Sequence, residues 1–337
     1  MDASTQTVPP EFAHALRELG LAGDGALRGV PLTGGVSSDI WRIDTPSGPV
    51  CAKRALPKLR VAADWQAPIE RNAYEARWMQ VADAAVPGSA PRVLGQLPAL
   101  GVLVMSYAPP ADHLLWKERL RQGQADPATA RAVGDTLARI HAYSAAHAEL
   151  AAQFPTDRIF YDIRLDPYLV ATARKHPGLA TELQALVTQT QAHKHALVHG
   201  DVSPKNILVG PRGPVLLDAE CAWWGDPAFD LAFCLNHLLL KCLWCPPARP
   251  AFLACFGALA DAYLRGVDWE APAALETRAA ALLPALLLAR VDGKSPVEYL
   301  DSEAQRDAVR RTAAALLRAP VRRLDDVSAA WRRELER

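Results

Sequence analysis

The chain has 337 residues, half of them hydrophobic, and its 37 Lys plus Arg balance 37 Asp plus Glu. This length allows two domains or two lobes, with enough apolar residues for a large core. A net charge of zero gives no electrostatic case for nucleic acid or an anionic membrane surface as a partner. We therefore expect a small or locally recognised ligand.

Targeting signals are not evident in the sequence. The N-terminal stretch MDASTQTVPPEF has neither the basic start nor the apolar centre of a signal peptide. The longest apolar run, residues 279–289, has 11 residues, and about 20 are needed to span a bilayer. We expect a cytoplasmic protein whose apolar helices form either the core or a homodimer interface.

The six cysteines lie in apolar segments, and two of them, Cys242 and Cys245, have CxxC spacing. A zinc site would need a second ligand pair at similar spacing, which the sequence does not offer. The favoured interpretation is buried thiols in a reducing compartment, and a metal or redox pair is the alternative.

The first third of the chain alternates turn signals with strand patterns. Residues 31–39 form a turn-rich loop with a Gly-Gly pair, and Thr45–Gly48 is a second turn. In chain order we expect a helix over 9–21, strands over 40–43 and 50–55, a helix from Pro68, and strands over 93–97 and 101–105.

Beyond residue 110 long Ala- and Leu-rich helical patterns dominate, with one β-rich island at 197–218. The expected helices are 128–149, 178–194, 229–243, 249–264, 273–290 and 303–317. This order predicts an α+β protein with a small N-terminal lobe (1–105), built from an antiparallel sheet and a helix, and a larger, mainly helical C-terminal lobe (106–337).

The β-rich island contains the residues best suited to chemistry. Asp201 follows a glycine after one short strand, Asn206 comes five residues later, and Asp218 ends a further strand. We expect all three at the ends of adjacent strands, facing one cleft. Carboxylate and amide oxygens hold Mg²⁺ in proteins, and phosphoryl transfer also uses a carboxylate near the attacking hydroxyl.

The motif order in this region is typical of a known superfamily. His199-Gly-Asp201, Asn206, Asp218 twelve residues later and the downstream Gly225-Asp-Pro-Ala-Phe-Asp230 resemble the catalytic and metal-binding loops of protein-kinase-like proteins. Within that superfamily they are similar to the aminoglycoside phosphotransferase and choline kinase branch. The resemblance implies a bilobal fold and an ATP- and Mg²⁺-dependent kinase that phosphorylates a small-molecule hydroxyl.

The resemblance also implies roles for residues at matching positions. Asp201 would be the catalytic base or the group that orients the hydroxyl, and Asn206 and Asp218 would hold Mg²⁺. Glu220 would be either a further metal ligand or a local hydrogen-bonding group. His199 and Asp230 would be structural. The residues implied in nucleotide binding are Lys53, Glu75 (with Glu70 as competitor for Lys53), Gly34, Gly35 and Ser37 in the loop over the phosphates, and Met105 and Tyr107 at the hinge.

Several segments resemble 5-methylthioribose kinases more closely. They are Lys53–Arg60, Met105–Pro110 and Asp218–Gly225. This similarity implies a methylthioribose-like sugar as the acceptor, held in part by a tandem Arg310-Arg311 pair, although an exposed helical pair is the alternative. Trp223 and Trp224 are assigned either to the acceptor pocket or to the core.

The loop Asp201-Val-Ser-Pro-Lys-Asn206 departs from the methylthioribose kinase pattern, which tends to lack the Asn. Ser203 and Lys205 also differ from relatives beside the expected phosphate. Aminoglycoside, choline and homoserine therefore stay open as acceptors. A nucleotide-binding protein without catalysis is the alternative from another functional class.

Overall fold

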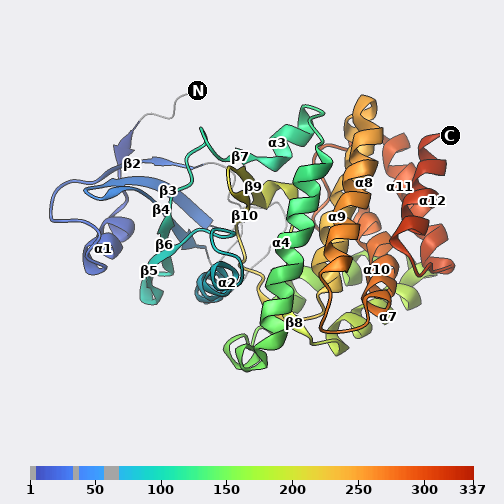
Figure 1. Cartoon of the computed structure of the whole chain (residues 1–337), viewed down its shortest axis with the longest axis horizontal. Coiled ribbons are helices and arrows are strands. Elements are labelled where there is room, and N and C mark those ends of the chain that lie inside the picture. The colour runs from blue at the N-terminus through green and yellow to red at the C-terminus, as the bar shows by residue number, and fades with distance from the viewer. Residues whose placement is uncertain (1–4, 33–37, 57–67) are drawn as a thin grey trace.

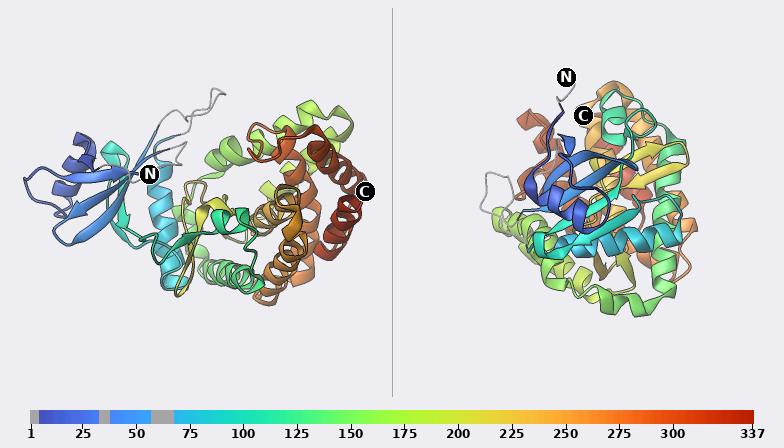
Figure 2. Two further views of the ribbon diagram at one scale, coloured as in Figure 1. Left: turned by 90° about the horizontal axis from the view of Figure 1, so that it is seen from above. Right: turned by 90° about the vertical axis from the view of Figure 1, so that its left-hand side faces the viewer.

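The computed structural model describes residues 5–32, 38–56 and 68–337. One end of the molecule is an antiparallel six-stranded sheet in the order β1-β2-β3-β4-β6-β5 (Figures 1 and 2). Its strands are β1 (Gln6–Thr7), β2 (Arg28–Pro31), β3 (Ser38–Thr45), β4 (Gly48–Ala55), β5 (Val93–Leu97) and β6 (Val102–Ser106). The same end carries α1 (Pro10–Glu18) and α2 (Arg71–Ala85).

The strand β4 has different contacts on its two faces because successive side chains alternate. Val50 and Ala52 join a small core with residues of α1. Lys53 points to the opposite face and pairs in register with Ile40 on β3 and Leu103 on β6. Lys53 is therefore fixed in the middle of the sheet, on the face toward α2.

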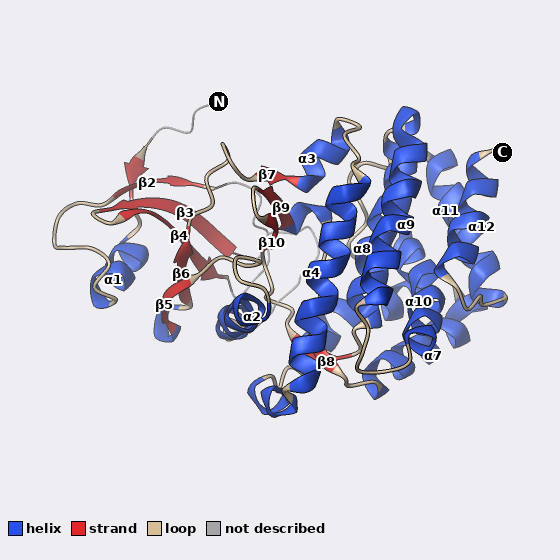
Figure 3. Ribbon diagram, in the orientation of Figure 1, coloured by secondary structure: helices blue, strands red, loops and turns tan. Residues whose placement is uncertain are grey.

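The other end of the molecule is built mainly of helices (Figure 3). They are α3 (Trp116–Arg121), α4 (Pro127–Ala146), α5 (Asp157–Phe160), α6 (Ala171–Lys175), α7 (Ala180–Ala192), α8 (Ala228–Trp244), α9 (Arg249–Arg265), α10 (Pro272–Asp292), α11 (Glu303–Arg318) and α12 (Leu324–Leu335). A π-helix, η3 (Tyr161–Val170), precedes α6. Short 3-10 turns are η1 (Pro98–Leu100), η2 (Ala148–Gln153), η4 (Pro177–Leu179), η5 (Pro204–Asn206) and η6 (Pro246–Ala248).

Packing in this helical lobe depends on small residues and on long apolar faces. A Cβ added at Gly134 of α4 would lie 2.4 Å from the Leu259 carbonyl oxygen of α9, so glycine permits this close approach. Helix α10 is long and apolar enough to cross a membrane, but 67% of its 18-residue apolar stretch is buried in the fold. Such burial is typical of a core helix, so α10 is only weak evidence for a membrane-spanning segment. Its apolar run, residues 279–289, faces the core.

The β-rich island contributes strands to two small sheets. They comprise β7 (Leu114–Leu115), β9 (Ile207–Gly210) and β10 (Gly213–Leu216) in the order β10-β9-β7, and β8 (Ala196–Val198) with β11 (Trp223–Gly225). The expectation that the strands before Asp201 and after Asn206 are neighbours is wrong, because β8 and β9 belong to different sheets.

The predicted α+β class, with a small sheet-containing lobe and a larger helical lobe, is confirmed. All six cysteines are free thiols. Burial raises the pKa of the Cys242 thiol to about 12, which makes it a poor nucleophile at neutral pH.

Candidate active site

Lys53 is the link between the sheet and the β-rich island. Its side chain is 4% exposed, and its ammonium group donates to Glu75 at 2.9 Å and also to Asp218. Burial alone would lower the pKa of Lys53, but the carboxylates of Asp218, Glu75 and Glu220 raise it well above its usual value. Lys53 therefore carries a fixed positive charge between the lobes.

The partner of Lys53 on α2 is Glu75, not Glu70. The Glu75 side chain is 1% exposed and points at the Lys53 ammonium. Glu70 is exposed at the N-terminal end of the same helix. The difference arises because α2 begins at Arg71, and one turn later its buried face places Glu75 against the sheet.

Asp230 holds the backbone of the loop that carries Asp201. Its carboxylate is fully buried and accepts hydrogen bonds from the backbone N–H of His199 at 2.7 Å and of Gly200 at 2.8 Å. His141 Nε2 lies 3.2 Å from the same carboxylate. Gly200 has φ 78°, a backbone conformation that favours glycine, and an added Cβ there would lie 2.7 Å from the Cys221 carbonyl oxygen.

His199 joins the loop to the segment before Asp218. The Asp201 backbone N–H donates to His199 Nδ1 at 3.1 Å, and His199 Nε2 lies 3.0 Å from the Leu217 carbonyl. Burial lowers the pKa of His199, although Asp230 and other carboxylates oppose this. Because Nδ1 accepts from the Asp201 N–H, the ring proton lies on Nε2, and the ring bridges two backbone segments.

The carboxylate of Asp201 lies between two basic side chains. Arg164 of η3 is 3.0 Å away, and Lys205 of η5 is 3.3 Å away. Burial would raise the pKa of Asp201, but Lys205 and Arg164 outweigh it and lower the pKa. Arg164 also donates to the Gly200 carbonyl, so it fixes both the loop and its carboxylate.

Asn206 and Asp218 approach each other through the backbone. The Asn206 amide nitrogen donates to the Asp201 carbonyl at 3.1 Å, and the Leu217 N–H donates to the Asn206 carbonyl at 2.8 Å. Asp218 has φ 65° and is the only non-glycine residue with positive φ in the part of the chain that the structure describes. Such backbone strain is typical of functional sites.

The oxygen donors here fit a magnesium ion. The Asp218 carboxylate is 29% exposed, and the amide oxygen of Asn206 points away from the Asp201 carbonyl. Across residues 5–32, 38–56 and 68–337, no three His, Cys, Asp or Glu side chains form a metal-binding group. Mg²⁺ commonly takes one or two carboxylates plus water and phosphate oxygens, so a sparse oxygen set suits it.

Glu220 forms local ion pairs. It accepts from Arg71 Nε at 3.0 Å and lies 4.0 Å from the Lys53 ammonium. These contacts fit the hydrogen-bonding interpretation, and its role as a metal ligand stays a prediction.

The predicted hinge and phosphate loop are only partly described. Met105 is buried at the end of β6, and Tyr107 follows that strand with its ring 5.8 Å from the Arg42 guanidinium. Gly34, Gly35 and Ser37 lie outside the described residues. The nucleotide contacts of all five residues stay predictions.

The residues predicted for the acceptor have other partners. Trp223 is 1% exposed, stacks on Phe160 with ring centroids 4.2 Å apart and donates to Asp157. Trp224 is half-buried on β11.

The two arginines of the predicted tandem pair are also engaged. Arg310 bonds Asp292, Asp307 and Glu303, and Arg311 bonds Glu334. These contacts lie within the helical lobe and do not support a role for the arginine pair in acceptor binding.

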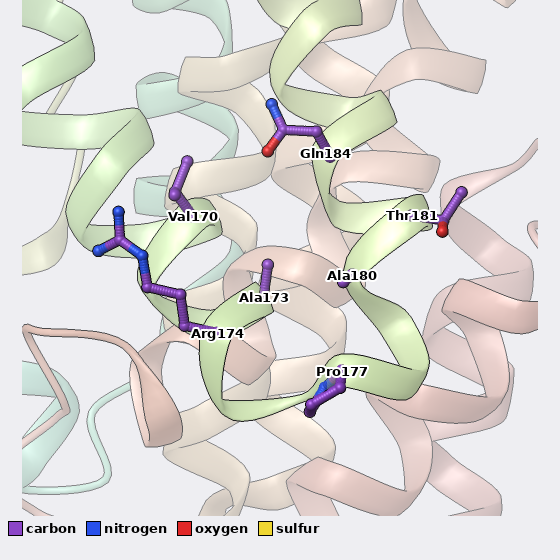
Figure 4. A pocket seen from close by; sticks show the side chains of 7 residues that line it. All are labelled: Val170, Ala173, Arg174, Pro177, Ala180, Thr181 and Gln184. Atoms are coloured by element: carbon purple, nitrogen blue, oxygen red, sulfur yellow. The ribbon is translucent and has the colours of Figure 1, made fainter.

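One cavity of about 770 Å³ lies apart from this site (Figure 4). It is bordered by the end of η3, by α6 and by the start of α7, and Arg174 and Gln184 are among its lining residues. Its lining includes none of the predicted site residues.

Arg164 is the site residue that the sequence did not single out. It lies 36 residues before Gly200, in a segment where Pro167 interrupts any simple helical pattern. Its only signal in the sequence is that it lies between two apolar residues, Ile163 and Leu165.

A sheet lobe with a buried lysine, facing a helical lobe whose loop presents Asp201, Asn206 and Asp218, is the arrangement of the protein-kinase-like fold. The sequence profile described as the phosphotransferase enzyme family matches residues 28–275. The chain belongs to this family, as the motif order predicts.

Among curated proteins, methylthioribose kinases are similar to this chain. The chain is 29% identical over 218 residues to a methylthioribose kinase of Klebsiella pneumoniae, which covers 56% of this chain and 53% of the relative. It is 28% identical over 221 residues to a methylthioribose kinase of Cronobacter sakazakii, covering 57% and 54%. The chain thus spans about half the length of these relatives.

Solved structures show the same fold at low identity. An amicoumacin kinase has a TM-score of 0.56 at 12% identity, covering 93% of this chain and 95% of the other. An ethanolamine kinase of Plasmodium vivax has a TM-score of 0.52 at 12% identity, covering 88% and 84%. A macrolide 2'-phosphotransferase of Brachybacterium faecium has a TM-score of 0.50 at 21% identity, covering 93% and 99%.

Proposed function

We propose that this protein is an ATP- and Mg²⁺-dependent kinase that transfers the γ-phosphate to a hydroxyl of a small molecule. The observation that carries the proposal is that each lobe contributes a buried group of ion pairs to the candidate site, one around Lys53 and one around Asp201. Lys53 is buried against Glu75 and Asp218 on one side, and Asp201 is held by Arg164 and Lys205 on the other.

Each side chain has a role that its surroundings support. Lys53 is positively charged and binds phosphate oxygens. Asp201 is ionised, since nearby cations lower its pKa, and it orients the acceptor hydroxyl and receives its proton. His199 and Asp230 keep the Asp201 loop rigid, so that these groups need little rearrangement during the reaction.

Asn206 and Asp218 would hold Mg²⁺, which neutralises phosphate charge when bound. The Asp218 carboxylate is paired with Lys53. The boundary between the nucleotide-binding and catalytic lobes near residues 105–106 stays a prediction. A cytoplasmic location also stays a prediction.

We propose a methylthioribose-like sugar as one candidate acceptor, on the basis of the curated relatives. Their similarity to this chain covers about half of their length. Aminoglycoside, choline and homoserine are the other candidates within the same reaction class.

The test of the reaction is a pair of substitutions. Asp201→Asn removes the proton acceptor, so turnover should fall by roughly 10²–10⁴-fold, while calorimetry still detects nucleotide binding. Asp218→Ala should abolish the magnesium dependence of nucleotide binding.

An unchanged rate in Asp201→Asn would disprove its catalytic role, and unchanged magnesium-dependent binding in Asp218→Ala would disprove the metal site. Asp135→Asn, on the exposed face of α4, is the matched control. Normal ATP binding without any phosphorylated product, across a broad metabolite panel, would favour a nucleotide-binding protein without catalysis.

A further inference from the structure

Basic side chains gather in the helical lobe, next to the loop that carries Asp201. We call them the basic cluster; they come from α3, η5, α8 and α10 and are Lys117, Lys205, His237, Lys241 and Arg290. The elements that carry them pack together, because α3 contacts both η5 and α8, and α10 packs against α8. Burial together with Arg290, Lys241, Lys205 and Lys117 lowers the pKa of His237 well below its usual value. The basic cluster therefore occupies one region of the helical lobe.

The basic cluster is continuous with the reaction site. Lys205 lies 3.3 Å from the Asp201 carboxylate. Arg164, also paired with Asp201, lies over the Tyr168 ring at 5.7 Å, and the Tyr168 hydroxyl accepts from Arg290 at 3.1 Å. A molecule whose hydroxyl lies at Asp201 would therefore have the basic cluster beside it, on the side of the helical lobe.

Lys241 is the most unusual member of the cluster. It is 1% exposed, and within the described part of the chain its ammonium forms no ion pair. Its close contacts are the ring faces of Trp244 at 4.5 Å and Tyr299 at 4.6 Å. Burial lowers the pKa of Lys241 to about 7, assisted by Lys117. A buried ammonium without an anionic partner is costly, so an incoming anion would stabilise it.

Within the described ranges, two residues near Lys241 have polar atoms without a hydrogen-bond partner. Among the described residues, the Tyr299 hydroxyl and the Arg290 Nε are buried without a hydrogen-bond partner. Both can donate a hydrogen bond, as can the ammonium of Lys241. Native proteins rarely leave such groups unsatisfied, and acceptor oxygens of a bound ligand would satisfy them.

The acidic residues around the cluster do not balance its charge. Glu298 is bound by Lys117, and Glu118 is bound by Arg121 at 2.8 Å. Asp201 already has two cationic partners, and Asp218, which also raises the pKa of Lys205, is paired with Lys53. The local potential is therefore positive, although the whole chain is neutral.

We propose that the acceptor of this kinase is an anionic hydroxy compound whose carboxylate or phosphate group binds the basic cluster, with Lys241, Arg290 and Tyr299 as donors. The proposal rests on the kinase function proposed above. It disfavours cationic amines such as choline and aminoglycosides, because like charges would meet in the site.

The test is an ADP-release assay with MgATP and five acceptors: glycerate, ribose 5-phosphate, methylthioribose, choline and kanamycin. We expect turnover with glycerate or ribose 5-phosphate, and which of these reacts separates carboxylate from phosphate recognition. Lys241→Met should raise KM for that acceptor at least tenfold, with a smaller change in kcat. Lys175→Met, exposed at the end of α6, should behave as wild type.

Lys117→Gln gives a second variant at a partly exposed position, should Lys241→Met fail to fold. Turnover only with methylthioribose, choline or kanamycin would overturn the proposal and leave the kinase function intact. An unchanged KM in the folded variants would overturn it as well. If wild-type protein neither binds nor hydrolyses MgATP, the kinase function itself fails, and the anionic acceptor fails with it.

Discussion

Replacing Asp230 with Asn tests how the loop that carries Asp201 is held in place. The Asp230 carboxylate is fully buried and accepts from the backbone N–H groups of His199 and Gly200 at 2.7 and 2.8 Å. In Asn one of the two oxygens becomes an amide donor, so one of these N–H groups meets a donor. The other keeps an acceptor but loses the charge of the carboxylate.

The magnitude follows from these two bonds. A buried N–H left without an acceptor costs about 1–3 kcal/mol, and weakening the second, charge-assisted bond costs on the order of 1 kcal/mol. Removing a buried charge offsets part of this cost. We expect Asp230→Asn to lower the free energy of unfolding by about 2–3 kcal/mol, and to lower turnover because Asp201 is less well positioned.

Urea unfolding followed by circular dichroism measures the loss of stability, and hydrogen exchange of the His199 and Gly200 amides locates it. Asp261→Asn, on the exposed face of α9, is the matched control and should be close to wild type. Unchanged exchange of both amides, with stability within about 0.5 kcal/mol of wild type, would show that Asp230 does not hold the loop.

Two further substitutions test other ion pairs of the structure. Glu75→Gln removes one of the carboxylates that orient Lys53. KM for ATP should therefore rise roughly 10- to 150-fold, since a charge-assisted bond contributes about 1.5–3 kcal/mol; the exposed Glu70→Gln should leave it unchanged. Arg310→Met removes a cation that, against burial, lowers the pKa of Asp292. Its contribution to stability is present above the unfolded-state pKa of Asp292 and is lost as the pH falls through the lowered folded-state pKa. Urea unfolding should therefore show a larger destabilisation at pH 7 than at pH 3, without a change in acceptor KM; an equal effect at both pH values would contradict a stabilising ion pair.

The regular helices of the C-terminal lobe follow closely from hydrophobic periodicity. The expected helix over 249–264 is observed as α9 (Arg249–Arg265), and that over 303–317 as α11 (Glu303–Arg318). The segment 161–170 was not predicted, because a π-helix places its side chains at a spacing that the 3.6-residue rule does not detect.

The candidate site was partly predictable, because the order of motifs in the sequence singles out its residues. Asp201, Asn206 and Asp218 lie within 18 residues in sequence, and the short strands predicted around them led to the expectation that they face one cleft. Their catalytic and metal-binding roles stay predictions. The way they meet was not predictable, since it depends on backbone bonds such as Leu217 N–H to the Asn206 carbonyl instead of strand pairing.

Positive charge around Asp201 was the least predictable feature of the molecule. Lys117, Lys205, Lys241 and Arg290 lie on four elements, and each alone is an ordinary cation in the sequence. Only the fold brings them together, and the zero net charge of the chain conceals the local excess. Because burial makes a local field stronger than the same charges at a surface, this cluster, and not the overall composition, would select the acceptor in the reaction proposed above.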